Sequence, residues 1–201
     1  MPISSPVAIA DTQRWLERAV IGLNLCPFAR GVHVKGQIHY AVSHAQTPHE
    51  LLQDLNVELT DLLAHDAATR DTTLLIATAC LADFLDFNDF LAQAEQALRA
   101  LKLDGVVQIA SFHPDFQFAG TTVDDITNFT NRSPYPTLHL LREDSIDRAV
   151  RAFPEAATIF EHNMQTLERL GPTGWAALGL GRSTGPPDDE PHSETPPGKI
   201  E

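Results

Sequence analysis

The spacing of apolar residues along the chain separates expected helices from expected strands. Apolar side chains recur every three to four positions in residues 11–23, 48–63 and 86–101, which is the spacing of a buried helix face. In residues 32–42 they recur at every second position, which predicts a half-buried strand. Residues 72–80 form a continuous apolar run whose length fits a strand covered on both faces. Helices and strands are therefore expected to alternate.

Polar residues at the starts of the helical segments supply the expected N-caps. Asp11 precedes the first segment and Asp86 precedes the third. Thr47 and Glu50 form a capping box at the second, with Pro48 at the first helical position. The capping box predicts where the second helix begins.

The second half of the chain adds two strands and two helices to the pattern. Strands are predicted at residues 106–112 and from Thr137 onward, and a short helix follows Asp144. A longer helix follows Pro154 and ends at Gly171. The expected element order is therefore αβαβαββαα.

Short connections between the first three strands and their helices predict an α/β fold. Such strand–helix–strand units form right-handed crossovers between parallel strands, so we expect a mixed four-stranded sheet of three parallel strands plus one antiparallel strand, with flanking helices. The last 20 residues hold five of the fourteen prolines and one apolar residue. We expect a loose lead-in at 1–10, a single domain at 11–181 and a disordered, acidic, Pro-rich tail at 182–201.

Charge and composition exclude several functional classes. The 201 residues carry a net charge of −13 and include three lysines, which argues against a nucleic-acid binder because such proteins need a basic patch. No apolar run approaches the ~20 residues of a membrane span, so we expect no membrane partner. The N-terminus shows no basic leader followed by an apolar run, and we expect a cytoplasmic protein whose two cysteines stay reduced.

A long stretch without regular periodicity, residues 113–136, connects the last two expected strands. Connections longer than ~12–15 residues are usually functional or disordered, and the aromatic residues in this one argue against disorder. Ligand sites on open α/β sheets form outside the carboxyl ends of the strands. An antiparallel fourth strand brings both ends of the stretch to one such edge. We assign catalytic roles there to His113 and Asp115, and substrate-binding roles to Asn131, Arg132, Ser133 and Tyr135.

The residue types in this stretch point to an anionic small molecule. Arg132 can donate two parallel hydrogen bonds to a carboxylate or phosphate. His113 can exchange a proton near neutral pH, and Asp115 can orient its ring. The alternative is structural, because His-Pro-Asp can be a simple turn and Arg132 can hold loop carbonyls. Asn131 and Ser133 can likewise cap the loop.

Cys26 is a third catalytic candidate, because a thiolate near a cation can act as a nucleophile. Arg30 is the nearest cation in the sequence. The short link to the first strand places the thiol at the opposite sheet edge from His113, so a dyad requires the long loop to cross. The alternative is that Cys26 is a small buried hydrophobic residue.

Metal and cofactor motifs are missing from the sequence. The nine histidines show no spacing that is diagnostic of metal ligands. The sequence also has no Gly-rich phosphate loop, no G-x-S-x-G elbow and no H-E-x-x-H motif. No metal site is predicted, and the cofactor is unknown at this stage.

Four strings are long enough to compare with known families: VIGLNLCPFA (20–29), VHVKGQIHYAVS (32–43), SFHPDFQF (111–118) and NRSPYPTLHLLRE (131–143). In this order they resemble a bacterial family catalogued as domain of unknown function 1415. The resemblance spans nearly the whole expected domain. It implies an uncharacterised protein of about this size and brings no reaction, cofactor or residue role.

Two functional hypotheses follow from the sequence. In the first, the protein is a small cytoplasmic enzyme that acts on an anionic metabolite by general acid/base chemistry. Arg132 then holds the anion, His113 transfers the proton and Asp115 orients the imidazole. In the second, the protein is a non-catalytic ligand-binding or protein-interaction module that uses the 113–135 loop. The sequence by itself does not separate the two.

Overall fold

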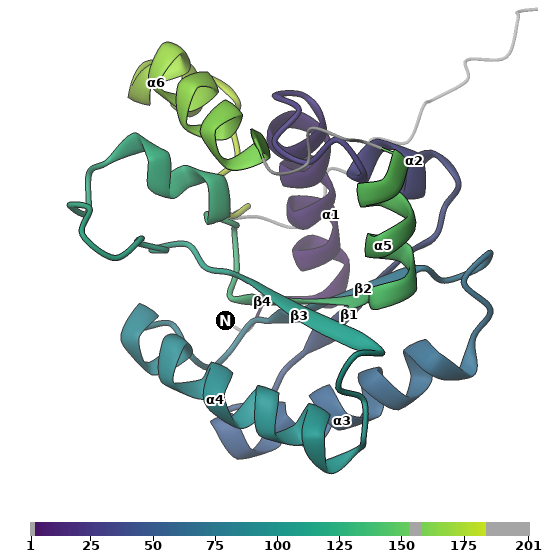
Figure 1. Ribbon diagram of the computed structural model, residues 1–201. Coiled ribbons are helices and arrows are strands. Elements are labelled where there is room, and N and C mark those ends of the chain that lie inside the picture. Colours follow the sequence, from purple (N-terminus) through teal and green to yellow (C-terminus); the bar gives the residue numbers. More distant parts are fainter. Residues whose placement is uncertain (1–2, 153–157, 184–201) are drawn as a thin grey trace, which may run out of the picture.

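The computed structural model describes residues 3–152 and 158–183 and has a four-stranded sheet at its centre (Figure 1). The strands are β1 (Ile38–Ser43), β2 (Thr72–Ala77), β3 (Val107–Phe112) and β4 (Thr137–Arg142), in the spatial order β1-β2-β4-β3. β1 pairs with β2 in parallel, and β4 is antiparallel to both β2 and β3. A mixed α/β fold on one four-stranded sheet is therefore confirmed.

The expected set of three parallel strands is wrong. Within the described sheet only β1 and β2 pair in parallel, because β4 inserts between β2 and β3. The connection from β2 to β3 therefore passes over one strand position in the sheet. β4, which follows the long connection after β3, occupies that position. β3 still runs in the direction of β2, since each is antiparallel to β4. The ends of β2 and β3 and the start of β4 thus lie at the same sheet edge.

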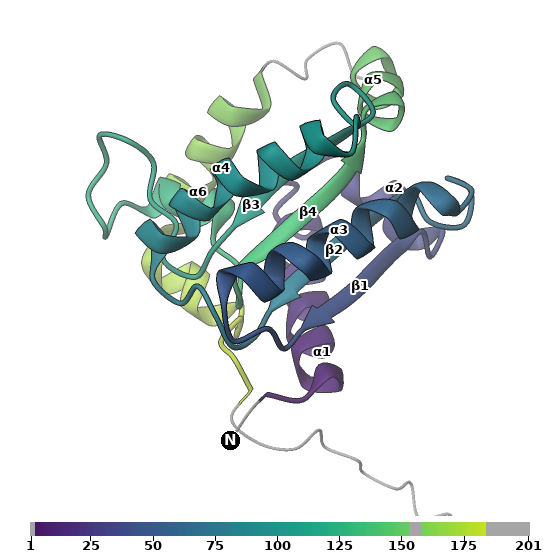
Figure 2. The ribbon, with the colours of Figure 1, turned by 90° about the horizontal axis from the view of Figure 1, so that it is seen from below.

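One face of the sheet is covered by two regular helices, α3 (Pro48–Ala64) and α4 (Phe84–Ala100), which lie side by side (Figures 1 and 2). All six residues of β2 are buried, as expected for a strand covered on both faces. The core beneath the two helices contains large, almost fully buried side chains: Leu51, Leu55, Leu59, Leu62, Phe87 and Phe90. Burying each of them contributes about 1.5–3 kcal/mol, so this layer is a main source of stability.

The starts of α3 and α4 show how local signals position these helices. The Thr47 hydroxyl accepts a hydrogen bond from the Glu50 amide, and the Glu50 carboxylate returns to the Thr47 amide, so the predicted capping box is confirmed. The predicted cap of α4 at Asp86 is wrong. Asp83 has the extended backbone that a cap needs, and its carboxylate accepts hydrogen bonds from the amides of Leu85 and Asp86.

The opposite face of the sheet carries shorter and less regular elements. They are α1 (Ser5–Trp15), the π-helical segment η1 (Leu16–Ile21), α2 (Ala29–Val34), the 3₁₀ helix η2 (Ile126–Asn131), α5 (Glu143–Ala152) and α6 (Ile159–Ala177). Figure 1 shows α1, α2, α5 and α6 on this side of the sheet. Segments from both halves of the chain therefore build this face together.

Helix α1 begins at Ser5, so the predicted helix start after Asp11 is wrong. The loose lead-in predicted for residues 1–10 is accordingly wrong from Ser5 onward. The buried side of α1 carries the polar residues Asp11 and Thr12, which interrupt the apolar spacing on which the prediction relied. Burial of these polar groups requires partners elsewhere in the fold, and sequence spacing does not reveal such partners.

The first strand begins at Ile38 rather than at Val32. The residues before it form α2, and Gly36 turns the chain between α2 and β1 with a φ of +66°. Val34, one of the alternating apolar residues, is 78% exposed. The alternation of apolar and polar residues therefore extends over a short helix, and the apolar side chains of that helix are not buried.

The C-terminal part of the domain is bent and docked. Gly171 interrupts α6 with a φ of 66° and a ψ of 174°, so the predicted helix end is the position of a kink. The predicted helix start after Pro154 and residues 184–201 of the predicted tail lie outside the described residues. Arg182 and Ser183, which were also assigned to the tail, contact the domain.

Candidate functional site

The two ends of the connection between β3 and β4 meet at one edge of the sheet, as expected. Phe112, the last residue of β3, pairs with Thr137, the first residue of β4. The His113 amide donates a hydrogen bond of 3.1 Å to the Asn131 carbonyl, which joins the entry of the connection to its exit. The structure therefore brings the predicted residues of this stretch into one neighbourhood, but their side chains have different environments.

His113 is fully buried, and both of its ring nitrogens are bonded to the backbone. Nδ1 accepts a hydrogen bond from the Asp115 amide at 3.0 Å, which leaves Nε2 to donate to the Leu81 carbonyl at 3.1 Å. The rings of Phe84 and Phe87 pack beside the imidazole, with centroids 5.4 and 5.1 Å away. Burial lowers the pKa of His113 and favours the neutral ring. The imidazole thus holds two loops together.

Asp115 contacts His113 through its backbone rather than through its carboxylate. The Asp115 amide orients the imidazole, whereas the residue itself is exposed. Its carboxylate acts on Arg132 instead: burial lowers the pKa of Arg132, and the negative charge of Asp115 opposes that shift. The Asp115 carboxylate therefore acts on the charge of Arg132 rather than orienting the His113 imidazole.

Cys26 and His113 lie on different sides of the sheet. Cys26 packs against the cluster around Trp15 on the α1 side, whereas His113 contacts the side chains of α4. Burial raises the pKa of the Cys26 thiol, although the amides of Phe28 and Ala29 act in the opposite direction. A raised pKa favours the thiol over the nucleophilic thiolate. The structure therefore does not assemble the hypothetical dyad.

Arg132 is held by backbone carbonyls of its own loop. Its Nε donates to the Phe116 carbonyl at 3.2 Å, and Nη2 donates to the Val123 carbonyl at 2.8 Å. The guanidinium also lies over the Phe129 ring, 4.2 Å from its centroid. These contacts agree with the structural alternative for Arg132. Nη1, however, has no hydrogen bond to any residue that the structure describes.

The other three residues predicted to bind substrate make internal hydrogen bonds. The Ser133 hydroxyl donates to the Tyr135 carbonyl at 2.6 Å. The Tyr135 hydroxyl is buried and donates to the Asp11 carboxylate at 2.7 Å. The Asn131 side-chain amide donates to the Ser111 carbonyl at 3.3 Å. Ser133 lines the cavity described next, whereas Asn131 and Tyr135 lie behind its wall.

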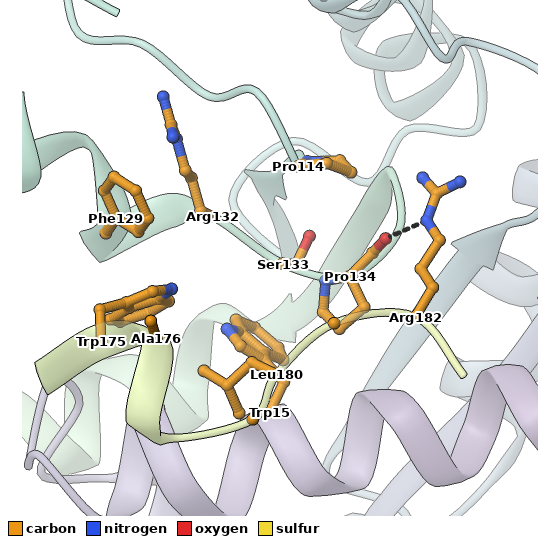
Figure 3. A pocket seen from close by; sticks show the side chains of 12 residues that line it. Trp15, Pro114, Phe129, Arg132, Ser133, Pro134, Trp175, Ala176, Leu180 and Arg182 are labelled. Carbon is orange, nitrogen blue, oxygen red and sulfur yellow. Dashed lines mark hydrogen bonds between the residues drawn. The ribbon is translucent and has the colours of Figure 1, made fainter. Parts of the chain in front are cut away.

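A cavity of about 380 Å³ opens between the exit of the long connection, α1 and the end of α6 (Figure 3). Its larger apolar lining residues are Trp15, Pro114, Phe129, Pro134, Trp175 and Leu180, and Ala176 also lines it. Arg132, Ser133 and Arg182 supply its polar side chains. In Figure 3 the two tryptophan rings lie at the base of the view, and the two arginine side chains rise on either side of Ser133.

Arg182 is a site residue that the sequence analysis missed, because it was assigned to the tail. Its Nε donates to the Pro134 carbonyl at 2.6 Å, and its guanidinium lies 4.8 Å from the centroid of the Tyr135 ring. The next residue fixes the chain, since the Ser183 amide and hydroxyl donate to the Asp11 carboxylate at 2.9 and 2.5 Å. These are long-range contacts, so no local motif signals them.

Asp11 connects α1, the entrance to β4 and the C-terminal segment through a buried carboxylate. It accepts hydrogen bonds from Tyr135 and Ser183, and it forms an ion pair of 3.0 Å with Arg14. Burial by itself raises the pKa of Asp11, but these hydrogen bonds and the Arg14 charge outweigh burial, so the pKa is lowered. An ionised Asp11 therefore holds one side of the cavity in place.

The charged side chains that line the cavity are both cations, although the protein as a whole is acidic. The described lining contains two arginines and no Asp or Glu. Neither arginine forms an ion pair with a carboxylate in residues 3–152 and 158–183. Unpaired guanidinium groups favour anions, because a carboxylate or phosphate accepts their hydrogen bonds in parallel. The arrangement is suited to holding an anion with an apolar body.

A second cavity, of about 190 Å³, lies between β1 and α3 and was not predicted. Its polar lining comprises His39, Ser43, Asp54 and Glu58. The Ser43 hydroxyl donates to Asp54 at 2.6 Å, and Glu58 Oε2 lies 3.7 Å from His39 Nε2. Burial raises the pKa of Glu58 and lowers the pKa of His39, so both groups favour their neutral forms. This cavity is half the size of the first and lacks its aromatic walls.

Two further features were sought among the side chains and helices of residues 3–152 and 158–183: a cluster of metal-ligand side chains and a helix of membrane-spanning length. Residues 3–152 and 158–183 contain no group of three His, Cys, Asp or Glu side chains placed to hold a metal ion. In the same ranges, no helix combines the length and apolar character needed to cross a bilayer.

Comparison with known proteins identifies the family of this chain but assigns no function to it. No curated protein and no solved structure matches the chain. A family model matches residues 7–177, a stretch that includes Arg132 and both tryptophans of the cavity but ends before Arg182. The resemblance noted in the sequence is thereby confirmed, and the chain belongs to the family described as Protein of unknown function (DUF1415).

Proposed function

We propose that this protein is a non-catalytic ligand-binding protein whose cavity between α1, η2 and α6 takes a small organic anion. One observation carries the proposal: Arg132 and Arg182 flank a single aromatic-lined cavity, and neither forms an ion pair with a described carboxylate. A guanidinium beside apolar walls gains from an anionic partner more than it does in water, because the surroundings screen the charge less.

Binding without proton transfer is favoured over acid/base catalysis. A general acid or base must lie within hydrogen-bond reach of the bound molecule. His113 is instead bonded to the backbone on both sides of its ring, and Cys26 packs elsewhere. The described lining of the cavity contains no His, Asp, Glu, Cys, Lys or Tyr, and the Ser133 hydroxyl already donates to a carbonyl. The arrangement therefore supplies charge complementarity without a proton carrier.

Both arginines are held in position before any ligand arrives. Two carbonyls fix Arg132, and the Pro134 carbonyl fixes Arg182. Ordering a long side chain on binding costs about 0.5–1.5 kcal/mol, and a side chain that is already ordered avoids most of that cost. The Nη1 atom of Arg132 and both Nη atoms of Arg182 make no hydrogen bond to a described residue and can donate to a ligand.

Titration with octanoate, using octanamide as the neutral control, tests this proposal. Trp15 and Trp175 are the two tryptophans of the chain and both line the cavity, so tryptophan emission reports on its occupancy. We expect octanoate to change the emission and raise the Tm, and octanamide to bind at least about tenfold more weakly because it lacks the charge. Arg132→Gln and Arg182→Gln should each lower octanoate affinity by about tenfold.

Arg99→Gln is the matched control for these two variants. Arg99 is an exposed residue near the end of α4, on the opposite face of the sheet, and its replacement should leave octanoate affinity unchanged. Equal affinities for octanoate and octanamide contradict the proposal. Wild-type octanoate affinity in Arg132→Gln and Arg182→Gln also contradicts it.

A further inference from the structure

We infer that the anion of this cavity is an aromatic monocarboxylate whose flat ring lies against Trp175 while its carboxylate accepts a hydrogen bond from Arg132. The inference rests on the proposed anion-binding function and narrows it to one class of ligand. Three features of the cavity support it: the apolar character of its walls, the surroundings of each aromatic ring, and the number and type of free donors.

The walls require a ligand with an organic body. Apart from the two arginines and Ser133, the side chains that line the cavity are apolar, and three of them are aromatic. An inorganic anion occupies only the arginine side and leaves these walls in contact with water. The volume of about 380 Å³ falls within the range of small-molecule sites. An apolar body therefore accounts for the part of the cavity that the arginines do not reach.

The surroundings of the rings identify Trp175 as the one that receives this body. Trp15 is only 2% exposed and packs edge-on against Phe112 at 5.1 Å, so it forms the floor. Phe129 is occupied by the Arg132 guanidinium at 4.2 Å and by the Trp175 edge contact at 5.0 Å. Trp175 is half-buried, packs against the cluster around Trp15 and makes an edge contact with the Phe129 ring. A flat ligand ring can pack against the remaining indole surface in an offset or edge-on arrangement.

The donors and the overall charge favour a single carboxylate. Arg132 offers Nη1 to a ligand beside Phe129 and Trp175, and Arg182 lies on the other side of Ser133 (Figure 3). A carboxylate can accept a hydrogen bond from Arg132 while the charge of Arg182 adds to the attraction. The net charge of −13 repels a polyanion more strongly than a monoanion, because the repulsion scales with the ligand charge. A monocarboxylate therefore gains the local attraction at the lowest long-range cost.

Calorimetric titration of the full chain with three related molecules tests the inference. 2-Naphthoate is flat and anionic, decahydro-2-naphthoate keeps the charge and the carbon skeleton but is not flat, and 2-naphthamide is flat and neutral. We expect 2-naphthoate to bind about fivefold more tightly than the saturated acid, because of the aromatic contact. It should bind about tenfold more tightly than the amide, because of the charge.

Two variants of Trp175 assign the preference to this residue. Trp175→Leu should remove the preference for 2-naphthoate over the saturated acid, since leucine keeps an apolar wall but offers no aromatic ring. Trp175→Phe should restore most of the preference, because it restores a ring. Circular dichroism of both variants checks that they are folded.

The outcomes separate this inference from the proposed function. Equal binding of 2-naphthoate and the saturated acid overturns the aromatic class but leaves anion binding standing. A preference that survives in Trp175→Leu also overturns the inference, because Trp175 is then not the residue that receives the ring. Binding of 2-naphthamide as tight as that of 2-naphthoate overturns both the inference and the proposed function, since the arginines then contribute nothing.

Discussion

The two faces of the sheet are built in different ways. On one face, α3 and α4 follow their strands directly and cover β2 with a continuous layer of large apolar side chains. On the other, α1 comes from the start of the chain, η2 from its middle and α6 from near its end. The larger cavity lies on this second face, between those three elements.

The difference shows where a fold of this kind leaves room for a ligand. Regular amphipathic helices interlock closely with a sheet, and protein interiors of that type reach the density of organic crystals. The second face contains a π-helical segment, a 3₁₀ helix and a kink at Gly171, and it buries the charge of Asp11. Such irregular elements do not present a continuous apolar stripe, so polar groups enter the interior and a cavity remains beside them.

The largest effect is expected on the regular face. Leu55→Ala removes a fully buried side chain from α3 and should lower the free energy of unfolding by about 3 kcal/mol, because it leaves a cavity in the main core. Val57→Ala changes an exposed residue of the same helix and should alter it by less than about 0.5 kcal/mol. Urea denaturation measures both. Similar losses in the two variants would show that the α3 layer is not packed as described.

A smaller but specific effect is expected at the buried carboxylate of the irregular face. Asp11→Ala removes the acceptor of Tyr135 and Ser183 and should lower the free energy of unfolding by about 2 kcal/mol at neutral pH. Because the pKa of Asp11 is lowered in the folded state, its contribution is complete above the unfolded value of 3.8 and is lost as the pH falls through the folded value.

Urea denaturation at several pH values checks the Asp11 prediction. The difference between wild type and Asp11→Ala should be constant from about pH 7 to pH 5 and should shrink below about pH 4. Asp89→Ala is a suitable control, since Asp89 is exposed on α4 and its carboxylate makes no hydrogen bond to a described residue. A difference that stays constant down to pH 3 would show that the Asp11 carboxylate is not preferentially stabilised by its partners.

The smallest effect is expected at His113, which follows β3 and packs against α4. Its pKa is lowered by burial, so the neutral ring contributes stability above pH 6.5, and that stability is lost as the pH falls through the folded pKa. Between about pH 7.5 and 5.5, wild type should lose about 1 kcal/mol more of its free energy of unfolding than His113→Gln does. The variant retains His39 and His139, whose pKa values are also lowered, so the comparison isolates His113.

Chemical denaturation at the two pH values distinguishes the two interpretations of His113. A steeper pH dependence in wild type than in His113→Gln supports the buried, backbone-bonded ring. Equal pH dependence in the two proteins would mean that the ring titrates as it does in water, and His113 would return to the candidates for proton transfer.

Local signals predicted the regular face well and the irregular face poorly. Thr47 and Glu50 are three residues apart, so their capping box is visible in the sequence and present in the structure. Aspartate is a common N-cap residue, so the sequence suggested that role for Asp11. Its observed partners, Tyr135 and Ser183, are more than 120 residues away. Helix propensity and spacing describe neighbours in sequence, and they carry no information about partners at such separations.

The candidate site shows the same difference between features that local sequence signals predict and features that they do not. The sequence placed Arg132 and Ser133 at a ligand-binding edge, and both line the larger cavity. The sequence also placed His113 there. In the structure, however, its ring is buried and bonds to the Leu81 carbonyl. Arg182 was missed, because it directly precedes the Pro-rich segment and was assigned to it.

The sequence by itself determined the α/β class, the α3 capping box and the buried β2 strand. Each of these depends on residues that are close together in the chain. The tertiary structure alone decided the insertion of β4 between β2 and β3, the separation of Cys26 from His113 and the placement of Arg182 opposite Arg132. These features depend on how distant segments pack, because buried polar groups such as the Asp11 carboxylate take whichever partners the fold brings to them.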